Sequence, residues 1–141
     1  MTIRELAPAD MDAARTLLRA AELPIDDLDD DTIELVGAFD GDTLVGMIGL
    51  QTCGSVGLLR SLAVSPGRRG GGVAATLCKH VFGRARTMSS LWLLTTSAKE
   101  YFVRHGFEAV SRDAAPDEIR ATSQFSSLCP ASAHVMRRLT G

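Results

Sequence analysis

A glycine-rich turn between an apolar run and a helical pattern is the part of the sequence best suited to chemistry. Residues 58–77 read LLRSLAVSPGRRGGGVAATL, with Gly70, Gly71 and Gly72 in the turn. Such a turn leaves backbone N–H groups free at a helix N-terminus, where the helix dipole also favours negative charge. Glycine is needed because a Cβ would hold an anion away from those groups. The segment therefore predicts a site for a phosphate or pyrophosphate.

Two common phosphate-binding motifs do not describe this turn. A Walker loop closes with Gly-Lys-Ser/Thr, whereas Gly72 is followed by Val73 and Ala74. A dinucleotide-binding turn has the pattern G-x-G-x-x-G in the first βαβ unit of a parallel sheet. The three glycines here lie in mid-chain after hairpin-like strands, and the final glycine of that pattern is missing.

The strand, turn and helix, in this order, resemble the acetyl-CoA motif of the GCN5-related N-acetyltransferases. The core pattern of that family is Gln/Arg-x-x-Gly-x-Gly/Ala, and Arg69, Gly72 and Ala74 fill it. The resemblance implies that acetyl-CoA is a cosubstrate, with its pantetheine arm along the strand and its pyrophosphate on the turn. The residues implied to bind it are Leu62, Ala63, Val64, Arg69, Gly70, Gly71, Gly72, Val73, Ala74 and Ala75.

The rest of the chain alternates between strand and helix patterns. Strands are predicted at 2–6, 33–39, 44–53, 56–64, 91–96, 107–111 and 132–139. Helices are predicted to begin at Pro8 and to span 72–85, 98–105 and 116–125. The order predicts an α/β fold with a mixed sheet and helices on both faces. It agrees with the acetyltransferase fold, in which the resemblance implies that the fourth and fifth strands splay apart.

Composition limits the class of protein. A length of 141 residues predicts one domain over 1–141, here an acetyltransferase domain. A net charge of −2 without a basic and aromatic run argues against nucleic acid as a partner, and no apolar stretch is long enough for a membrane span. The three cysteines lack a C-x-x-C spacing and predict free thiols in the cytoplasm. Cysteine and histidine spacings predict no metal site.

A second segment bears on the catalytic acid. Residues 97–107, SAKEYFVRHGF, resemble the family segment in which a short helix ends in Gly-Phe. The family often carries, four residues before that glycine, a tyrosine placed to protonate the departing CoA thiolate. That position is Phe102 here, and the tyrosine stands at Tyr101, about 100° around a helix. Tyr101 is the candidate acid, and a half-buried packing role is the alternative.

The acceptor strand offers an arginine where many relatives carry a carboxylate base. Residues 55–64 contain no Asp or Glu, but they contain Arg60 and Ser61. Because a guanidinium binds carboxylates in a bidentate manner, both residues are candidates for binding an acidic group of the acceptor. The alternative is that Arg60 faces solvent or pairs with Glu34, since strand alternation alone does not decide its face. The remaining candidates for a general base are Glu22, Asp26, Asp27 and Glu34.

Short phrases such as GLLRSLAV at 57–64 and LTT at 94–96 resemble acetyltransferases associated with bacterial arsenic-resistance clusters. That branch implies acetylation of the α-amine of toxins such as arsinothricin or phosphinothricin. We therefore predict an acetyl-CoA-dependent N-acetyltransferase of a small amine. A protein or peptide N-acetyltransferase and a non-catalytic acetyl-CoA sensor are the alternatives. The family resemblance also leaves a homodimer through the last strands open.

Overall fold

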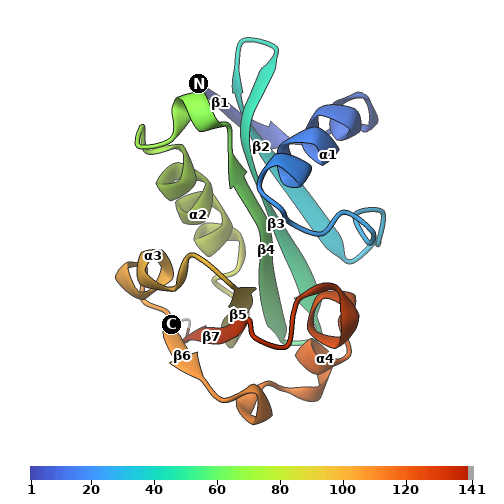
Figure 1. Ribbon diagram of the computed structural model, residues 1–141, viewed down its shortest axis with the longest axis vertical. Helices are drawn as coiled ribbons and strands as arrows, with labels where there is room; N and C mark the ends of the chain where they lie inside the picture. Colours follow the sequence, from blue (N-terminus) through green and yellow to red (C-terminus); the bar gives the residue numbers. More distant parts are fainter. Residues whose placement is uncertain (140–141) are drawn as a thin grey trace.

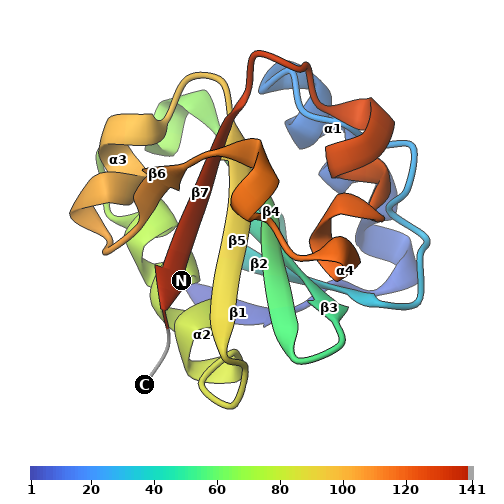
Figure 2. The ribbon, with the colours of Figure 1, turned by 90° about the horizontal axis from the view of Figure 1, so that it is seen from below.

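A seven-stranded mixed sheet forms the centre of the computed structural model, which describes residues 1–139 (Figures 1 and 2). The strands lie in the order β1-β2-β3-β4-β5-β7-β6, and all neighbours are antiparallel except β4 and β5. Their bounds are β1 Thr2–Glu5, β2 Ile33–Asp40, β3 Thr43–Cys53, β4 Val56–Val64, β5 Ser90–Thr95, β6 Glu108–Val110 and β7 His134–Leu139. The predicted mixed sheet is confirmed.

The sheet opens between β4 and β5. These two strands are paired only at Gly57 with Leu91 and at Leu58 with Trp92. Beyond Leu58, β4 continues for six residues along β3 but has no strand partner on its other side. The N–H and C=O groups on that side therefore have no hydrogen-bond partners in a neighbouring strand, so a ligand can bind to them.

Helices cover both faces of the sheet, as the sequence predicted. Helix α1 (Met11–Ala20) buries Leu18 against Met47, and α2 (Val73–Arg84) buries Leu77 against Ile48 on the opposite face. Met47 and Ile48 are neighbours in β3 and point to opposite faces because strand side chains alternate. Two short helices, α3 (Lys99–Arg104) and α4 (Asp117–Arg120), lie after β5 and after β6.

A glycine in β3 sets the position of α2. An ideal Cβ on Gly46 would lie 2.7 Å from Cγ1 of Val73, the first residue of α2. Any side chain at this position would push the helix away from the sheet. Gly46 therefore fixes the N-terminus of α2, and with it the glycine turn, close to the end of β4.

Two predicted helices differ from the structure. The first helix begins at Met11 rather than Pro8, because the Asp10 carboxylate accepts a hydrogen bond from the Ala7 N–H (2.7 Å) and holds a 3-10 turn at Pro8–Asp10.

The predicted helix over 116–125 is confirmed only at its start. Helix α4 ends at Arg120, and a separate π-type turn follows at Gln124–Leu128. The Thr122 hydroxyl donates to the Ile119 carbonyl (2.7 Å) and accepts from the Phe125 N–H (3.3 Å). These side-chain bonds compete with a continuous helical ladder.

Candidate active site

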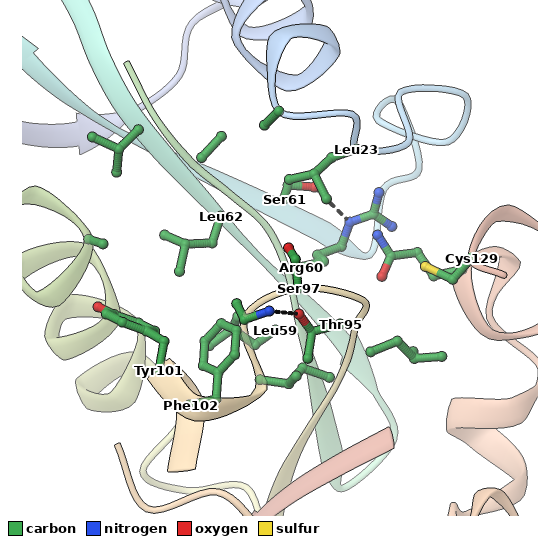
Figure 3. A pocket seen from close by; sticks show the side chains of 18 of the residues that line it. Leu23, Leu59, Arg60, Ser61, Leu62, Thr95, Ser97, Tyr101, Phe102 and Cys129 are labelled. Atoms are coloured by element: carbon green, nitrogen blue, oxygen red, sulfur yellow. Dashed lines mark hydrogen bonds between the residues drawn. The ribbon is translucent and has the colours of Figure 1, made fainter. Parts of the chain in front are cut away.

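The opening between β4 and β5 is a cleft of about 690 Å³ (Figure 3). Its walls come from β4, β5, α3, the turn before α2 and the start of α2, the segment after α1 and the segment before β7. We call the part at Val64, Arg69 and Ala74 the glycine end. We call the part at Leu23, Arg60, Ser61, Gln124 and Cys129 the arginine end.

The glycine end presents backbone donors without acceptors. Gly70 and Gly72 have φ values of +80° and +85°, and Gly72 caps α2. In the described part of the chain, the N–H groups of Gly70 and of residues 72–75 donate to no acceptor. An ideal Cβ on Gly70 or Gly72 meets no atom within 4 Å. The turn is therefore an open, donor-lined space of the kind that binds a phosphate group.

A β-bulge in β4 lies at the middle of the cleft. Ser61 has a φ of +57°, which is rare for a residue with a side chain. Two residues of β4, Ser61 and Leu62, lie opposite the single residue Ile48 of β3. A bulge bends its strand and turns the following residues relative to the ladder. Leu62 and Val64 become half-buried lining residues of the cleft, and no feature of the sequence pattern predicted this bulge.

Arg60 is buried at the arginine end and holds a carboxylate of this chain. Its Nη1 and Nη2 each lie 2.6 Å from an oxygen of Asp27, and the side chain is fully shielded from solvent. Nε donates to the Ser61 hydroxyl (3.2 Å), and Nη1 also donates to the Gln51 amide oxygen (3.4 Å). The bidentate pair ties β4 to the segment between α1 and β2.

This geometry changes the predicted roles of Arg60. Neither alternative for a structural role is correct: Arg60 does not face solvent, and Glu34 instead binds Arg84 at 2.7 Å. The direct role is also corrected, because Asp27 occupies both ends of the guanidinium fork that an acceptor carboxylate was expected to fill. Ser61 and Arg60 both line the cleft, which strand alternation alone had left undecided.

The predicted general bases do not lie on the cleft wall. Asp27 is bound to Arg60 and Glu34 to Arg84, and Glu22 and Asp26 are exposed. Among the described residues that line the cleft, Glu100 is the acidic one, and it lies on the exposed side of α3. A base on the cleft floor is therefore not provided by these carboxylates.

Tyr101 and Phe102 both line the cleft, but they point in different directions (Figure 3). Phe102 is 5% exposed, while the Tyr101 ring is directed toward α2 and lies 4.6 Å from the ring of His105. Within the described chain, the buried Tyr101 hydroxyl has no partner at hydrogen-bond geometry. Burial and the nearby Cys78 thiol raise the pKa of Tyr101 to about 12. These contacts favour the packing role over the predicted acid.

The cysteines are free and do not gather into a site. Cys53 and Cys78 are buried, and burial raises the pKa of each thiol to about 11. Cys129 lies at the arginine end, where burial again raises its pKa. No cluster of His, Cys, Asp or Glu suited to a metal ion occurs in residues 1–139. No helix in that range is long and apolar enough to cross a membrane.

The late segment of the chain forms a wall of the cleft, although no single residue in it was predicted as a site residue. Gln124 is 4% exposed and lines the arginine end together with Cys129. The residues TSQFSS around Gln124 are mostly polar, and the sequence predicted a helix over 116–125 here. No local signal marks Gln124 as buried, because its burial depends on β4 and β7 lying beside it.

Comparison with known proteins decides the family. The model of the acetyltransferase (GNAT) family matches residues 2–107, which is most of the chain. The chain belongs to the acetyltransferase (GNAT) family. The family and the GNAT-like fold predicted from the sequence are thus confirmed, and a family of N-acetyltransferases supports the prediction of an enzyme.

Solved structures with a similar fold match almost the whole length of this chain. N-acetylglutamate synthase from Neisseria gonorrhoeae, complexed with coenzyme A and N-acetyl-glutamate, has a TM-score of 0.83 and 24% identity, covering 99% of this chain and 35% of that one. Rv2747 from Mycobacterium tuberculosis, in complex with CoA, has a TM-score of 0.80 and 19% identity, with 100% of both chains covered.

A curated relative is the amino-acid acetyltransferase of Neisseria meningitidis. It is 35% identical over 85 residues, which cover 57% of this chain and 19% of the relative. The match therefore takes in about a fifth of the length of that relative and about a third of the gonococcal synthase.

Proposed function

We propose that this protein is an acetyl-CoA-dependent N-acetyltransferase whose acceptor is the amine of an amino acid or an amino-acid-like compound. The observation that carries the proposal is the set of N–H groups of Gly70 and of residues 72–75, which have no acceptor in the described chain and lie beside a cleft between splayed strands. Family membership supports it, as does the similarity to proteins crystallised with coenzyme A and, in one case, N-acetyl-glutamate.

The residues of the glycine end fit acetyl-CoA. The N–H groups of residues 70–75 would hold the pyrophosphate, and Arg69 adds a positive charge beside them. The unpaired edge of β4 at Leu62 and Val64 would bind the amide groups of the pantetheine arm. When bound, acetyl-CoA supplies a thioester carbonyl that an amine can attack. Backbone N–H groups on the β4 edge are the donors available to polarise that carbonyl.

We expect water and the acceptor amine itself to carry the protons of the reaction. Phe102 has no proton to give, the Tyr101 hydroxyl is turned toward α2, and the predicted bases lie off the cleft. The reacting amine must be neutral before it attacks the thioester. We therefore expect the rate to rise with pH until the acceptor amine itself is mostly deprotonated.

The arginine end favours a small acceptor over a peptide. Leu23 and Pro24 line it from one side, and Gln124 and Cys129 line it from the other. In Figure 1 the segment after α1 and the segment around α4 flank β4 on the same side. The sequence resemblance to the arsenic-resistance branch extends the proposal to toxins such as phosphinothricin. One domain over 1–141 and a cytoplasmic location remain predictions, and the homodimer stays open.

A non-catalytic acetyl-CoA sensor is the second candidate. The observation that favours it is the pair Phe102 and Tyr101, which leaves the cleft without the tyrosine hydroxyl of the family motif. Both candidates require acetyl-CoA to bind, so binding alone does not separate them.

Calorimetric titration with acetyl-CoA, followed by a thiol-release assay, tests the proposal. We expect saturable binding, and CoA release with L-glutamate or L-phosphinothricin but not with a lysine peptide. Binding without release over a broad panel of amines would point to the sensor. Absence of binding would contradict the reading of the glycine end and both candidates.

A further inference from the structure

The side-chain carboxamide of Gln124 is a polar group of the cleft that the site described above does not use. Gln124 lies in the π-type turn before β7, is 4% exposed and lines the arginine end. Within residues 1–139 its carboxamide makes no hydrogen bond, although its backbone carbonyl accepts one from Cys129 (2.9 Å). The Gln124 carboxamide atoms are not among the fully buried polar atoms that lack a partner, so they reach the cleft and can bind a group from outside this chain.

Ser61 offers a second donor at the same end. Its hydroxyl oxygen accepts from Arg60 Nε at 3.2 Å, and its own proton goes to no acceptor in the described chain. The backbone bulge at φ +57° fixes the Ser61 side chain at the wall of the cleft. The cation behind it makes this hydroxyl a better donor.

The groups left free at this end, an amide and a hydroxyl, can donate hydrogen bonds to an anion but carry no negative charge for a cation. Asp27 is already matched by Arg60, and no carboxylate of the described chain lines the arginine end. A cationic group would therefore meet no counter-charge. A carboxylate has two oxygens, one for the Gln124 amide and one for the Ser61 hydroxyl.

We infer that Gln124 and Ser61 together bind the carboxylate of the acceptor, with Gln124 as the residue that selects amino acids over simple amines. The inference rests on the proposed function and names the substrate class of the same site. Arg60 and Asp27 hold the site without binding the acceptor: they fix Ser61 and the facing segment, and their charges cancel.

Kinetics on the full chain test this inference. The probes are the common L-amino acids and L-phosphinothricin, each free acid compared with its α-amide where one exists. In the wild type we expect the free acid to be acetylated with at least tenfold higher kcat/KM than the amide. Gln124→Ala should raise KM for the acid at least tenfold, with kcat and the KM for acetyl-CoA nearly unchanged. Gln124→Glu should raise it further, because two carboxylates repel.

A matched control is Thr122→Ala, in the same segment. Thr122 is buried, bonds only to its own segment among the described residues and does not line the cleft. It should lower the melting temperature and leave KM for the acid unchanged, which separates destabilisation from lost recognition.

Two results would overturn the inference while leaving the proposed function intact. One is an unchanged KM in Gln124→Ala, and the other is acetylation of amides or carboxylate-free amines as efficiently as amino acids. A protein that fails to bind acetyl-CoA, or binds it and acetylates no amine, would instead overturn the proposed function and with it the inference.

Discussion

The two ends of the cleft are built in opposite ways. At the glycine end the polar groups are backbone N–H groups from one short stretch, and those of Gly70 and of residues 72–75 lack partners in the described chain. At the arginine end the polar groups are side chains from separate segments, and the strongest of them, Arg60 and Asp27, are already paired. Local backbone suits a ligand that a whole family shares, while assembled side chains suit a ligand that differs between members.

Substitutions at the two ends should therefore be harmful for opposite reasons. At the glycine end, adding a side chain is harmful because it fills the space in front of the donors. At the arginine end, removing a side chain is harmful because it leaves a buried partner without its match. The predictions below use this contrast, and they run from the largest expected effect to the smallest.

Asp27→Ala should be the most damaging change at the arginine end. It leaves the Arg60 guanidinium buried without a counter-charge, and we expect the free energy of unfolding to fall by about 3–5 kcal/mol. Chemical denaturation measures it. Asp26→Ala is the matched control, because Asp26 is an exposed neighbour and should change stability by less than about 0.5 kcal/mol. Equal effects of the two changes would show that the ion pair does not hold this end together.

Gly72→Ala tests the other end by addition. The new Cβ enters the open space before the N–H groups and also strains a residue at φ +85°. We expect acetyl-CoA affinity, measured by calorimetry, to fall at least about tenfold, which is about 1.4 kcal/mol.

Gly83→Ala provides the control for that change. Gly83 is exposed within α2, has open space around it and lacks a positive φ. Alanine there should stabilise the helix by up to about 1 kcal/mol without altering affinity. If Gly72→Ala also bound acetyl-CoA normally, the glycine end would not be the phosphate site.

Tyr101→Phe separates the packing role from the acid role. Removing a buried hydroxyl without a partner should raise the free energy of unfolding by about 1 kcal/mol. The kcat for the acceptor should change by less than about threefold, whereas loss of a general acid costs roughly a hundredfold or more. A large fall in kcat would restore Tyr101 as the catalytic acid.

The buried thiols should make the smallest difference, visible only at high pH. Folding raises the pKa of Cys53 and Cys78 from 9.0 to about 11, so the folded state holds these protons more tightly. The stability they support is complete below pH 9 and is lost as the pH rises toward 11. Melting temperatures between pH 8 and 10.5 should fall, and the slope should be shallower in Cys78→Ala. If melting temperature fell equally steeply with pH in Cys78→Ala, Cys78 would not contribute to the pH dependence of stability.

The sequence by itself determined the glycine end and the order of the elements. Glycine conformations, helix N-termini and apolar periodicity are local properties, so residues 70–75 and the strand and helix order could be identified from the chain. Even the displaced tyrosine was informative, because a one-residue shift on a helix turns a side chain by about 100°. In the structure the Tyr101 side chain accordingly points toward α2 (Figure 3).

Only the tertiary structure decided the arginine end. The Arg60–Asp27 pair joins residues 33 positions apart, and Gln124 reaches the cleft from a segment for which the sequence predicted only a helix. The bulge that places Ser61 arises from the pairing of β3 with β4, and no local propensity encodes it. Burial and ion pairing depend on which distant segments meet, so the residues that choose the acceptor became visible only when the chain was folded.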